Sequence, residues 1–130
     1  MIAVDTSALV AILFREPEAD AFEKILFDND VKLIATPTVL ELAVVLENRR
    51  GQAAREDGEV LITDSGLEIE AFTADHCALA IEAFLRFGKG RHPAKLNFGD
   101  CMSYALAKSL NAPLLYKGTD FGLTDIRSAV

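Results

Sequence analysis

The sequence contains no long apolar run. No stretch of its 130 residues approaches the roughly 20 apolar residues that cross a bilayer, and the N-terminus lacks the basic start and extended apolar segment of a signal peptide. We therefore expect a cytoplasmic protein without a membrane anchor. Cysteine is scarce as well: without an export signal, Cys77 and Cys101 are more often reduced, buried small residues than partners in a disulfide.

Positive charge and histidine are also in short supply. The 13 Lys and Arg residues are outnumbered by 20 Asp and Glu, and the net charge of −7 argues against a protein that coats nucleic acid along its whole surface. A local basic strip could still guide a phosphodiester. The two histidines, His76 and His92, are not spaced from the cysteines in any usual zinc-ligand pattern.

The chain does have enough apolar content for one core. Hydrophobic residues make up 51% of it, which suits a single domain over residues 1–130. Apolar strands alternate with amphipathic helices, an order typical of an α/β fold whose parallel sheet is covered on both faces. The predicted strands are residues 2–4, 31–35, 67–72 near the sheet edge, 113–116 and a short last one over 125–129. The predicted helices are residues 6–14, 17–26, 36–51, 52–63, 74–87 and 98–110.

Three aspartates lie at the ends of these predicted elements. Asp5 ends the first strand, Asp100 opens the last helix, and Asp120 follows the strand over residues 113–116. Ligands bind in open α/β sheets where the strands end, so we expect these carboxylates to converge. Like charges in a crevice cost several kcal/mol unless one is protonated or a cation neutralises them. Hard oxygen ligands suit Mg²⁺ or Mn²⁺ better than soft metals.

A fourth acid, Glu41, borders the face that the third helix should bury, one turn after Thr38. Each of the four acids also has an ordinary explanation on its own. Glu41 could complement a helix N-terminus, Asp100 could do the same, and Asp5 and Asp120 could be turn residues. Their coincidence at the ends of buried elements favours a metal site.

The loop over residues 88–95 gathers three fixed positive charges, Lys89, Arg91 and Lys95, just before Asp100. An acidic pocket repels RNA, so nearby cations could guide the phosphates toward it. The loop could equally be a solvated, glycine-rich connection. Both interpretations stay open at the level of sequence.

Four motifs stand in a fixed order along the whole chain. They are Asp5–Leu9 at the N-terminus, Glu41 in the third helix, Leu96–Cys101, and Leu114–Phe121 near the end. In this order they resemble the PIN-domain ribonucleases, and most closely the VapC-type toxins of bacterial toxin-antitoxin pairs. The resemblance implies a three-layer α/β/α sandwich with a central parallel sheet. It also implies a metal-dependent endoribonuclease that forms a homodimer and is inhibited by a cognate antitoxin.

The resemblance further assigns roles to individual residues. It implies four catalytic acids, namely Asp5, Glu41, Asp100 and Asp120. Asp5, Asp100 and Asp120 are the expected ligands of Mg²⁺ or Mn²⁺. Thr6 or Ser7 is expected to orient Asp5. Apart from the resemblance, Thr6, Ser7 and the basic loop residues Lys89, Arg91 and Lys95 are the candidates for positioning the substrate. Asp125 stands at a less regular position of the family, and the sequence leaves its role open.

The implied chemistry needs no nucleophilic side chain. A divalent ion polarises a phosphodiester oxygen and lowers the pKa of a bound water, which then attacks phosphorus in line. The sequence does not specify the RNA target, the antitoxin, or the use of one ion or two.

Two other functions compete with this hypothesis. A phosphoacceptor signalling domain also uses an acidic Mg²⁺ pocket, and Lys117 could be its late lysine. Such a domain needs an aspartate after its middle strand, where this chain has Thr73 and Ala74. The other alternative is a PIN-like scaffold that binds RNA or protein without cleaving, against which the four acids argue. A phosphatase of the Asp-x-Asp type is disfavoured because Ser7 stands where the second aspartate would be.

Overall fold

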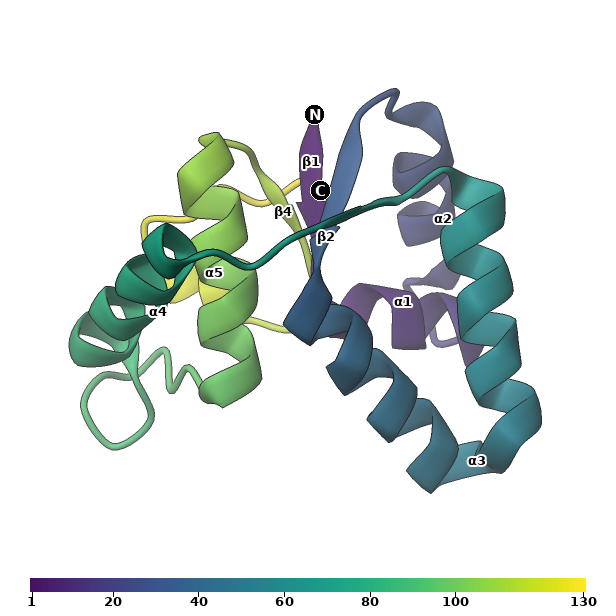
Figure 1. Ribbon diagram of the computed structural model, residues 1–130, viewed down its shortest axis with the longest axis horizontal. Helices are drawn as coiled ribbons and strands as arrows, with labels where there is room; N and C mark the ends of the chain where they lie inside the picture. Colours follow the sequence, from purple (N-terminus) through teal and green to yellow (C-terminus); the bar gives the residue numbers. More distant parts are fainter.

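The computed structural model describes residues 1–130 and builds them around a four-stranded sheet (Figure 1). The strands are β1 (Ile2–Val4), β2 (Lys32–Ala35), β3 (Glu68–Glu70) and β4 (Leu114–Leu115). All neighbours pair in parallel, in the order β3-β2-β1-β4. In the register, Ala3 lies opposite Leu33 on one side and opposite Leu114 on the other. The predicted parallel sheet, with the strand after residue 67 at its edge, is confirmed.

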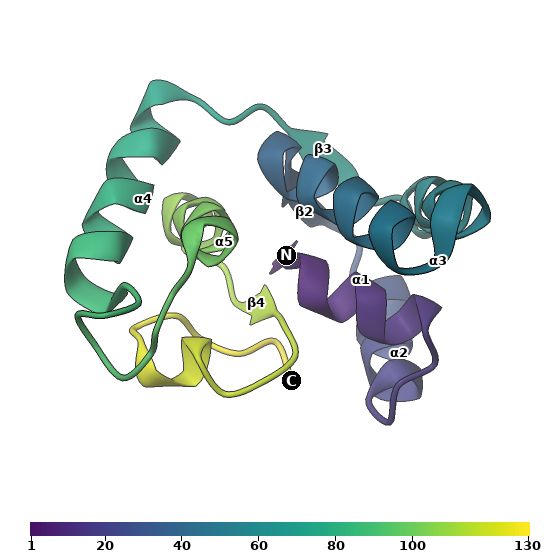
Figure 2. The ribbon, with the colours of Figure 1, turned by 90° about the horizontal axis from the view of Figure 1, so that it is seen from below.

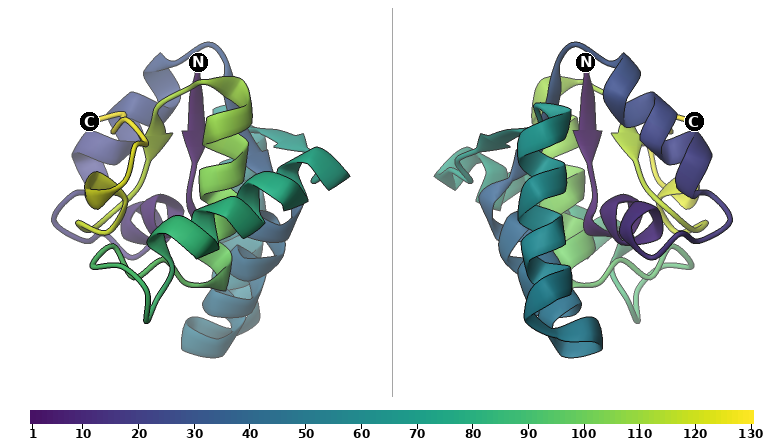
Figure 3. Two further views of the ribbon diagram at one scale, coloured as in Figure 1. Left: turned by 90° about the vertical axis from the view of Figure 1, so that its left-hand side faces the viewer. Right: turned by 90° about the vertical axis from the view of Figure 1, so that its right-hand side faces the viewer.

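Helices cover both faces of the sheet. They are α1 (Thr6–Leu13), α2 (Ala19–Asp28), α3 (Thr36–Ser65), α4 (Ala74–Phe87) and α5 (Phe98–Leu110), followed by the short 3₁₀ helix η1 (Phe121–Leu123). Figures 1 and 2 show α4 and α5 on one side of β1 and α1, α2 and α3 on the other. The side views of Figure 3 bring each helical layer to the front in turn. The predicted α/β/α sandwich is therefore confirmed. None of the helices combines the length and apolar content needed to span a bilayer.

The alternation of side chains along each strand divides the core in two. Ala3 packs toward α4 and α5, whereas its neighbours Ile2 and Val4 pack toward α1, α2 and α3. Leu114 and Leu115 are divided in the same way. A strand that is buried on both faces must be apolar at every position, which explains why β1 and β4 read as continuous apolar runs.

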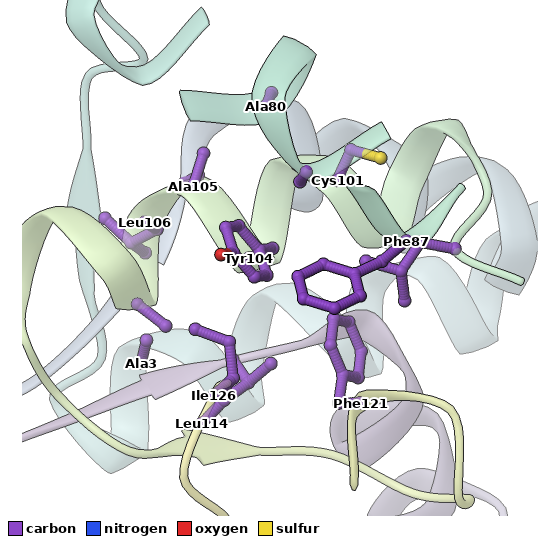
Figure 4. Packing of buried hydrophobic residues seen from close by; sticks show 14 of the residues in the cluster. Ala3, Ala80, Phe87, Cys101, Tyr104, Ala105, Leu106, Leu114, Phe121 and Ile126 are labelled. Atoms are coloured by element: carbon purple, nitrogen blue, oxygen red, sulfur yellow. The ribbon is translucent and has the colours of Figure 1, made fainter. Parts of the chain in front are cut away.

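Aromatic rings fill the core beneath α4 and α5 (Figure 4). Tyr104 is fully buried, and its ring lies 5.9 Å from that of Phe87. Phe121 and Ile126, from the segment after β4, pack against the same cluster. This packing holds the C-terminal segment, which carries Asp120, against α5.

The two helices predicted over residues 36–51 and 52–63 meet at Gly51, and the structure confirms this break, since α3 consists of two helical segments joined by a kink at Gly51. Gly51 has φ +81° and ψ −168°, a conformation that only glycine adopts readily. The structure departs from one predicted helix boundary. Pro17 was expected in the first turn of a helix, yet α2 begins at Ala19, after a turn in which the Ala19 N–H donates to the Glu16 carbonyl at 2.9 Å.

The predicted outer strands are shorter in the structure. Only Glu68–Glu70 of the expected strand 67–72 pairs with β2, and the side chains of these three residues are exposed at the sheet edge. The expected strand over residues 125–129 is reduced to one parallel bridge between Leu114 and Ser128.

Candidate active site

The site lies where the chain changes direction across the sheet. From β1 the chain passes to β2 on one side, and it returns later to β4 on the other side of β1. Such a switch point opens a crevice at the ends of its strands. Figure 1 shows α1 and α3 beginning just below the ends of β1 and β2. Asp5 directly follows β1, and its backbone N–H donates to the carbonyl of Leu115, at the end of β4, at 3.0 Å.

Asp5 is buried and is held at both carboxylate oxygens. Ser7 donates to Oδ2 from its backbone N–H at 3.0 Å and from its hydroxyl at 2.6 Å. The hydroxyl of Ser103, on α5, donates to Oδ1 at 2.5 Å. Ser7 is itself held by the backbone N–H of Lys117 at 2.9 Å. Three segments far apart in the sequence therefore fix this carboxylate, and the predicted role of Ser7 agrees with this geometry.

Glu41 is half-buried on the first turns of α3 and faces Thr6. The Thr6 hydroxyl lies 2.5 Å from Glu41 Oε1 and 3.3 Å from the carbonyl of Thr38. Burial raises the pKa of Glu41, the hydrogen bond from Thr6 opposes this rise, and the charge of Asp5 adds to it. The sequence predicts that Thr6 or Ser7 orients Asp5, and Ser7 is the one that contacts it. In the structure, Thr6 instead orients Glu41.

Asp100 stands on the first turn of α5 in a capping box. Its Oδ2 accepts from the backbone N–H of Asn97 at 3.0 Å, while the Asn97 side chain accepts from the Asp100 N–H at 2.9 Å. Burial raises the pKa of Asp100 to about 6 against the opposing hydrogen bond from Asn97, and repulsion from three carboxylates adds to the rise. These three carboxylates belong to Asp5, Glu41 and Asp120. Asp5, Glu41 and Asp120 therefore all lie near enough to Asp100 for their charges to act on it.

No side-chain cation neutralises this cluster. None of the four acids forms an ion pair, and the ammonium of Lys117 lies 3.2 Å and 3.1 Å from Glu16 and Glu18. Asp5 and Asp100 stand at helix N-termini, whose partial positive charge offsets their repulsion by at most about 2 kcal/mol each. Uncompensated carboxylates of this kind favour a bound cation.

The cluster suits a hydrated Mg²⁺ or Mn²⁺ better than a closed protein cage. No three Asp, Glu, His or Cys side chains converge closely enough to hold one ion by themselves. The oxygens of Asp5 are turned toward Ser7 and Ser103, and Asp100 is held by the Asn97 N–H. Mg²⁺ commonly takes only one or two carboxylates and fills its other positions with water and substrate phosphate oxygens. The donor set therefore fits such an ion.

Asp125 lies outside the cluster and is neutralised by other residues. Its two oxygens accept from the Tyr104 hydroxyl and the Lys108 ammonium, each at 2.7 Å, and Arg86 lies 3.7 Å away. Although partial burial raises the pKa of Asp125, these hydrogen bonds and cations lower it below its ordinary value overall. Asp125 thus anchors the C-terminal segment to α4 and α5.

The basic loop connects α4 to α5 and leads directly to Asp100. None of its three cations forms an ion pair, and no contact joins them to the four acids. Arg91 is partly used within the protein, since its Nε donates to the Leu85 carbonyl at 3.2 Å. The ammonium groups of Lys89 and Lys95 are therefore freer than the Arg91 guanidinium to contact phosphate.

Two polar residues of the site carry roles that the sequence reasoning missed. Ser103 is fully buried and its hydroxyl holds Asp5. The sequence feature that could have indicated this role is a serine three residues after Asp100, on the same face of the helix. Asn97 forms the capping box with Asp100. The sequence feature that could have indicated this role is an asparagine, a residue type common at helix N-caps, three positions before an acid.

Known proteins resemble this chain in sequence and in fold. The family model of the PIN domain matches residues 2–126. A protein of Mycolicibacterium smegmatis named ribonuclease VapC is 44% identical over 125 residues, which cover 96% of this chain and 97% of that protein.

Two solved structures share the fold at lower identity. One is Mycobacterium tuberculosis VapC20, described as a toxin that cleaves the sarcin-ricin loop, with a TM-score of 0.76 at 21% identity over 98% of this chain and 99% of that one. The other is VapBC2 from Rickettsia felis bound to a promoter DNA fragment, with a TM-score of 0.76 at 17% identity over 98% of this chain and 97% of that one. The family match and the near full-length identity show that this chain belongs to the PIN-domain family and, within it, to the VapC ribonucleases.

Proposed function

We propose that this VapC ribonuclease is a divalent-metal-dependent endoribonuclease that acts as the toxin of a toxin-antitoxin pair. The observation that carries the proposal is a cluster of four carboxylates without a cation partner, placed at the switch point of the sheet. The near full-length similarity to a ribonuclease supports the reaction class.

Asp5 and Asp100 are the proposed direct ligands of Mg²⁺ or Mn²⁺. Asp120 is the third proposed metal residue, acting through water or on a second ion, and Glu41 completes the catalytic set. When bound, the ion supplies Lewis-acid polarisation of the phosphodiester and an activated water. The hydroxyls of Ser7, Ser103 and Thr6 keep Asp5 and Glu41 in fixed orientations, so little reorganisation is needed during the reaction. Because the carboxylates repel the phosphates of RNA, binding of the substrate also needs positive charge near the site.

Lys89 and Lys95 are the proposed phosphate contacts outside the carboxylate cluster. Both lack an acidic partner in the protein, whereas Arg91 is partly used by its contact with Leu85. Exposed ammonium groups bind phosphates without sequence preference and mainly position the strand.

The function is tested by incubating the protein with a panel of structured RNAs in millimolar Mn²⁺ and mapping the products. We expect internal cuts at defined positions. Intact RNA across the panel would contradict the proposal and favour the non-cleaving scaffold. The phosphoacceptor alternative has little support, because Lys117 is engaged by Glu16 and Glu18.

The proposed protein partner is an antitoxin whose C-terminal segment inserts an Arg or Lys among the carboxylates. A guanidinium or ammonium group there would replace the metal charge. The complex named VapBC2 from Rickettsia felis supports a partner of this class for a protein of the same fold.

Changing that basic residue of the cognate antitoxin peptide to alanine should weaken binding by about 2–5 kcal/mol, the usual effect of removing one partner of a buried charge pair. Asp5→Ala or Asp120→Ala in this chain should weaken binding as well. Calorimetric titration measures both effects, with Asp125→Ala as a control that removes the same charge outside the site. Affinity unaffected by either site substitution would show that apolar contacts alone hold the peptide.

The proposed homodimer would use an apolar face formed by Leu40, Val44, Ile81, Phe84, Phe98 and Met102. These residues line two adjoining hollows on α3, α4 and α5 that share Phe98 and Met102. Phe98 is 81% exposed and Leu40 is 66% exposed. An exposed apolar surface that spans three helices is typical of a protein interface.

Phe98→Glu should convert the protein to a monomer, because it places a charge in the centre of this face. Light scattering coupled to size-exclusion chromatography measures the mass. Phe27→Glu on α2 is the matched control, since Phe27 is also an exposed phenylalanine, at 45%, but lies away from the face. An unchanged dimer mass for Phe98→Glu would place the interface elsewhere.

A further inference from the structure

Gly99 lies directly against the carboxylate of Glu41. It is the second residue of α5, and Glu41 stands on α3, 58 positions earlier in the chain. A methyl group on the Gly99 Cα would lie 2.7 Å from Cδ and 3.0 Å from Oε1 of Glu41, and closer still to Oε2. Cβ atoms in proteins essentially never approach other atoms this closely. These atoms are the far end of the flexible Glu41 side chain, so a side chain at position 99 requires the Glu41 carboxylate to move.

The backbone gives no other reason for a glycine at this position. Gly99 is helical, and its φ is not in the left-handed region. The glycines with positive φ are elsewhere, at Gly51, Gly66, Gly90 and Gly118. Inside a helix, glycine is about 1 kcal/mol less favourable than alanine. Helix propensity alone would therefore favour alanine at position 99. The close approach of the Glu41 carboxylate is what favours glycine there.

The other side of the same carboxylate is held by Thr6. The Thr6 hydroxyl lies 2.5 Å from Oε1, so the Glu41 carboxylate is fixed between α1 and α5. A hydrogen bond fixes the carboxylate on one side, and the missing side chain of Gly99 lets it lie close to α5 on the other. Gly99 immediately precedes Asp100, so a displacement of Glu41 at this point changes its distance from the proposed metal site.

We propose that Gly99 is a positioning residue that acts through Glu41, by leaving the space in which the Glu41 carboxylate must lie. This inference rests on the proposed function for its effect on catalysis, but the contact itself can be tested without any activity. A substituent at position 99 displaces the carboxylate from its place between α1 and α5 and disturbs its hydrogen bond with Thr6.

The first test is a double-mutant cycle on RNA cleavage. Gly99→Ala should lower the cleavage rate by about 10- to 100-fold, the range expected when a reacting group is misplaced by about 1 Å. Glu41→Asp has its own cost, but its shorter side chain withdraws the carboxylate from position 99. Adding Gly99→Ala to Glu41→Asp should therefore lower the rate by less than about threefold further. Equal losses in the two backgrounds would overturn the proposal.

The second test uses thermal melting in metal-free buffer and needs no RNA. In a Glu41→Ala background the added methyl group meets no carboxylate, so Gly99→Ala should raise the melting temperature by about 3 °C through helix propensity. In the wild-type background the same change should give no rise, or a fall. A rise of the same size in both backgrounds would show that the contact does not constrain position 99, and would overturn the proposal.

Gly122→Ala is the control substitution for both tests. Gly122 has ordinary surroundings, its nearest neighbour being the Tyr116 hydroxyl at 3.5 Å from an added Cβ, and its φ is not in the left-handed region. The two tests also separate the failure of this inference from that of the proposed function. A wild-type protein that cleaves no RNA contradicts the function, and the melting cycle then decides the role of Gly99 by itself.

Discussion

Asp100→Asn is expected to lower the rate of RNA cleavage by more than about 100-fold. Removing a residue that only supports a metal ligand costs up to about 100-fold, so the loss of a ligand itself should cost more. The substitution removes a proposed metal ligand but keeps the shape of the side chain. The amide oxygen can still accept from the Asn97 N–H, so the capping box should survive. Initial rates of cleavage of one RNA substrate, measured with equal amounts of folded protein, give the result.

The same substitution should stabilise the metal-free protein near pH 7. Burial and three neighbouring carboxylates raise the pKa of Asp100 to about 6 in the folded state, well above its unfolded value. Between these values the folded state binds more protons than the unfolded one, so wild-type stability should fall as pH rises through about 6. The advantage of Asp100→Asn over the wild type should therefore be largest at pH 7 and small near pH 4.

Asp125→Asn is the matched control, because it makes the same chemical change in an aspartate that anchors the C-terminal segment. It should lower the melting temperature, since Lys108 and Arg86 lose their charged partner, while RNA cleavage persists. Full cleavage by Asp100→Asn would remove that residue from the catalytic set. A large drop in its melting temperature would instead assign Asp100 a capping role.

Millimolar Mn²⁺ should stabilise the folded protein by about 2.7 kcal/mol when it exceeds the dissociation constant a hundredfold, because the ion binds the native carboxylate cluster and not the unfolded chain. For a chain of 130 residues this corresponds to a rise of about 10 °C in the melting temperature. Thermal melts with Mn²⁺ and with a chelator give the comparison. The rise should be smaller at pH 5, where protons compete with the metal for Asp100.

Asp5→Ala should remove most of that rise, whereas Asp125→Ala should keep it. If Mn²⁺ and chelator leave the wild-type melting temperature equal, the metal-site proposal loses its main support. A rise that survives Asp5→Ala would place the ion at other acids of this negatively charged chain.

The sequence was sufficient to predict the sheet and the position of its acids. A buried parallel strand must be apolar throughout, and the first charged residue after it marks its end, as Asp5 does for β1. Strand ends in a parallel sheet meet at one edge, so the convergence of Asp5 with the segment after β4 followed from topology. Other element boundaries were less predictable: α2 begins at Ala19 and not at Pro17, and the strand expected over residues 67–72 pairs only over Glu68–Glu70.

The details of the site depend on contacts between distant elements, and this limits prediction from sequence. Ser103 holds Asp5 across 98 positions of the chain. The sequence alone does not distinguish its hydroxyl from that of any other serine in a helix. The contact between Gly99 and Glu41 depends on how closely α5 approaches α3, which no local pattern specifies. Asp125 illustrates the converse: only the structure shows that Tyr104 and Lys108 engage its carboxylate.

The most direct test of the account is cleavage of a defined RNA by protein stripped of metal with a chelator and then dialysed. We predict no cleavage by the stripped protein, full recovery on adding Mn²⁺ or Mg²⁺, and no recovery for Asp100→Asn under the same conditions. RNA cleavage that persists in excess chelator would contradict a divalent-metal mechanism at the carboxylate cluster.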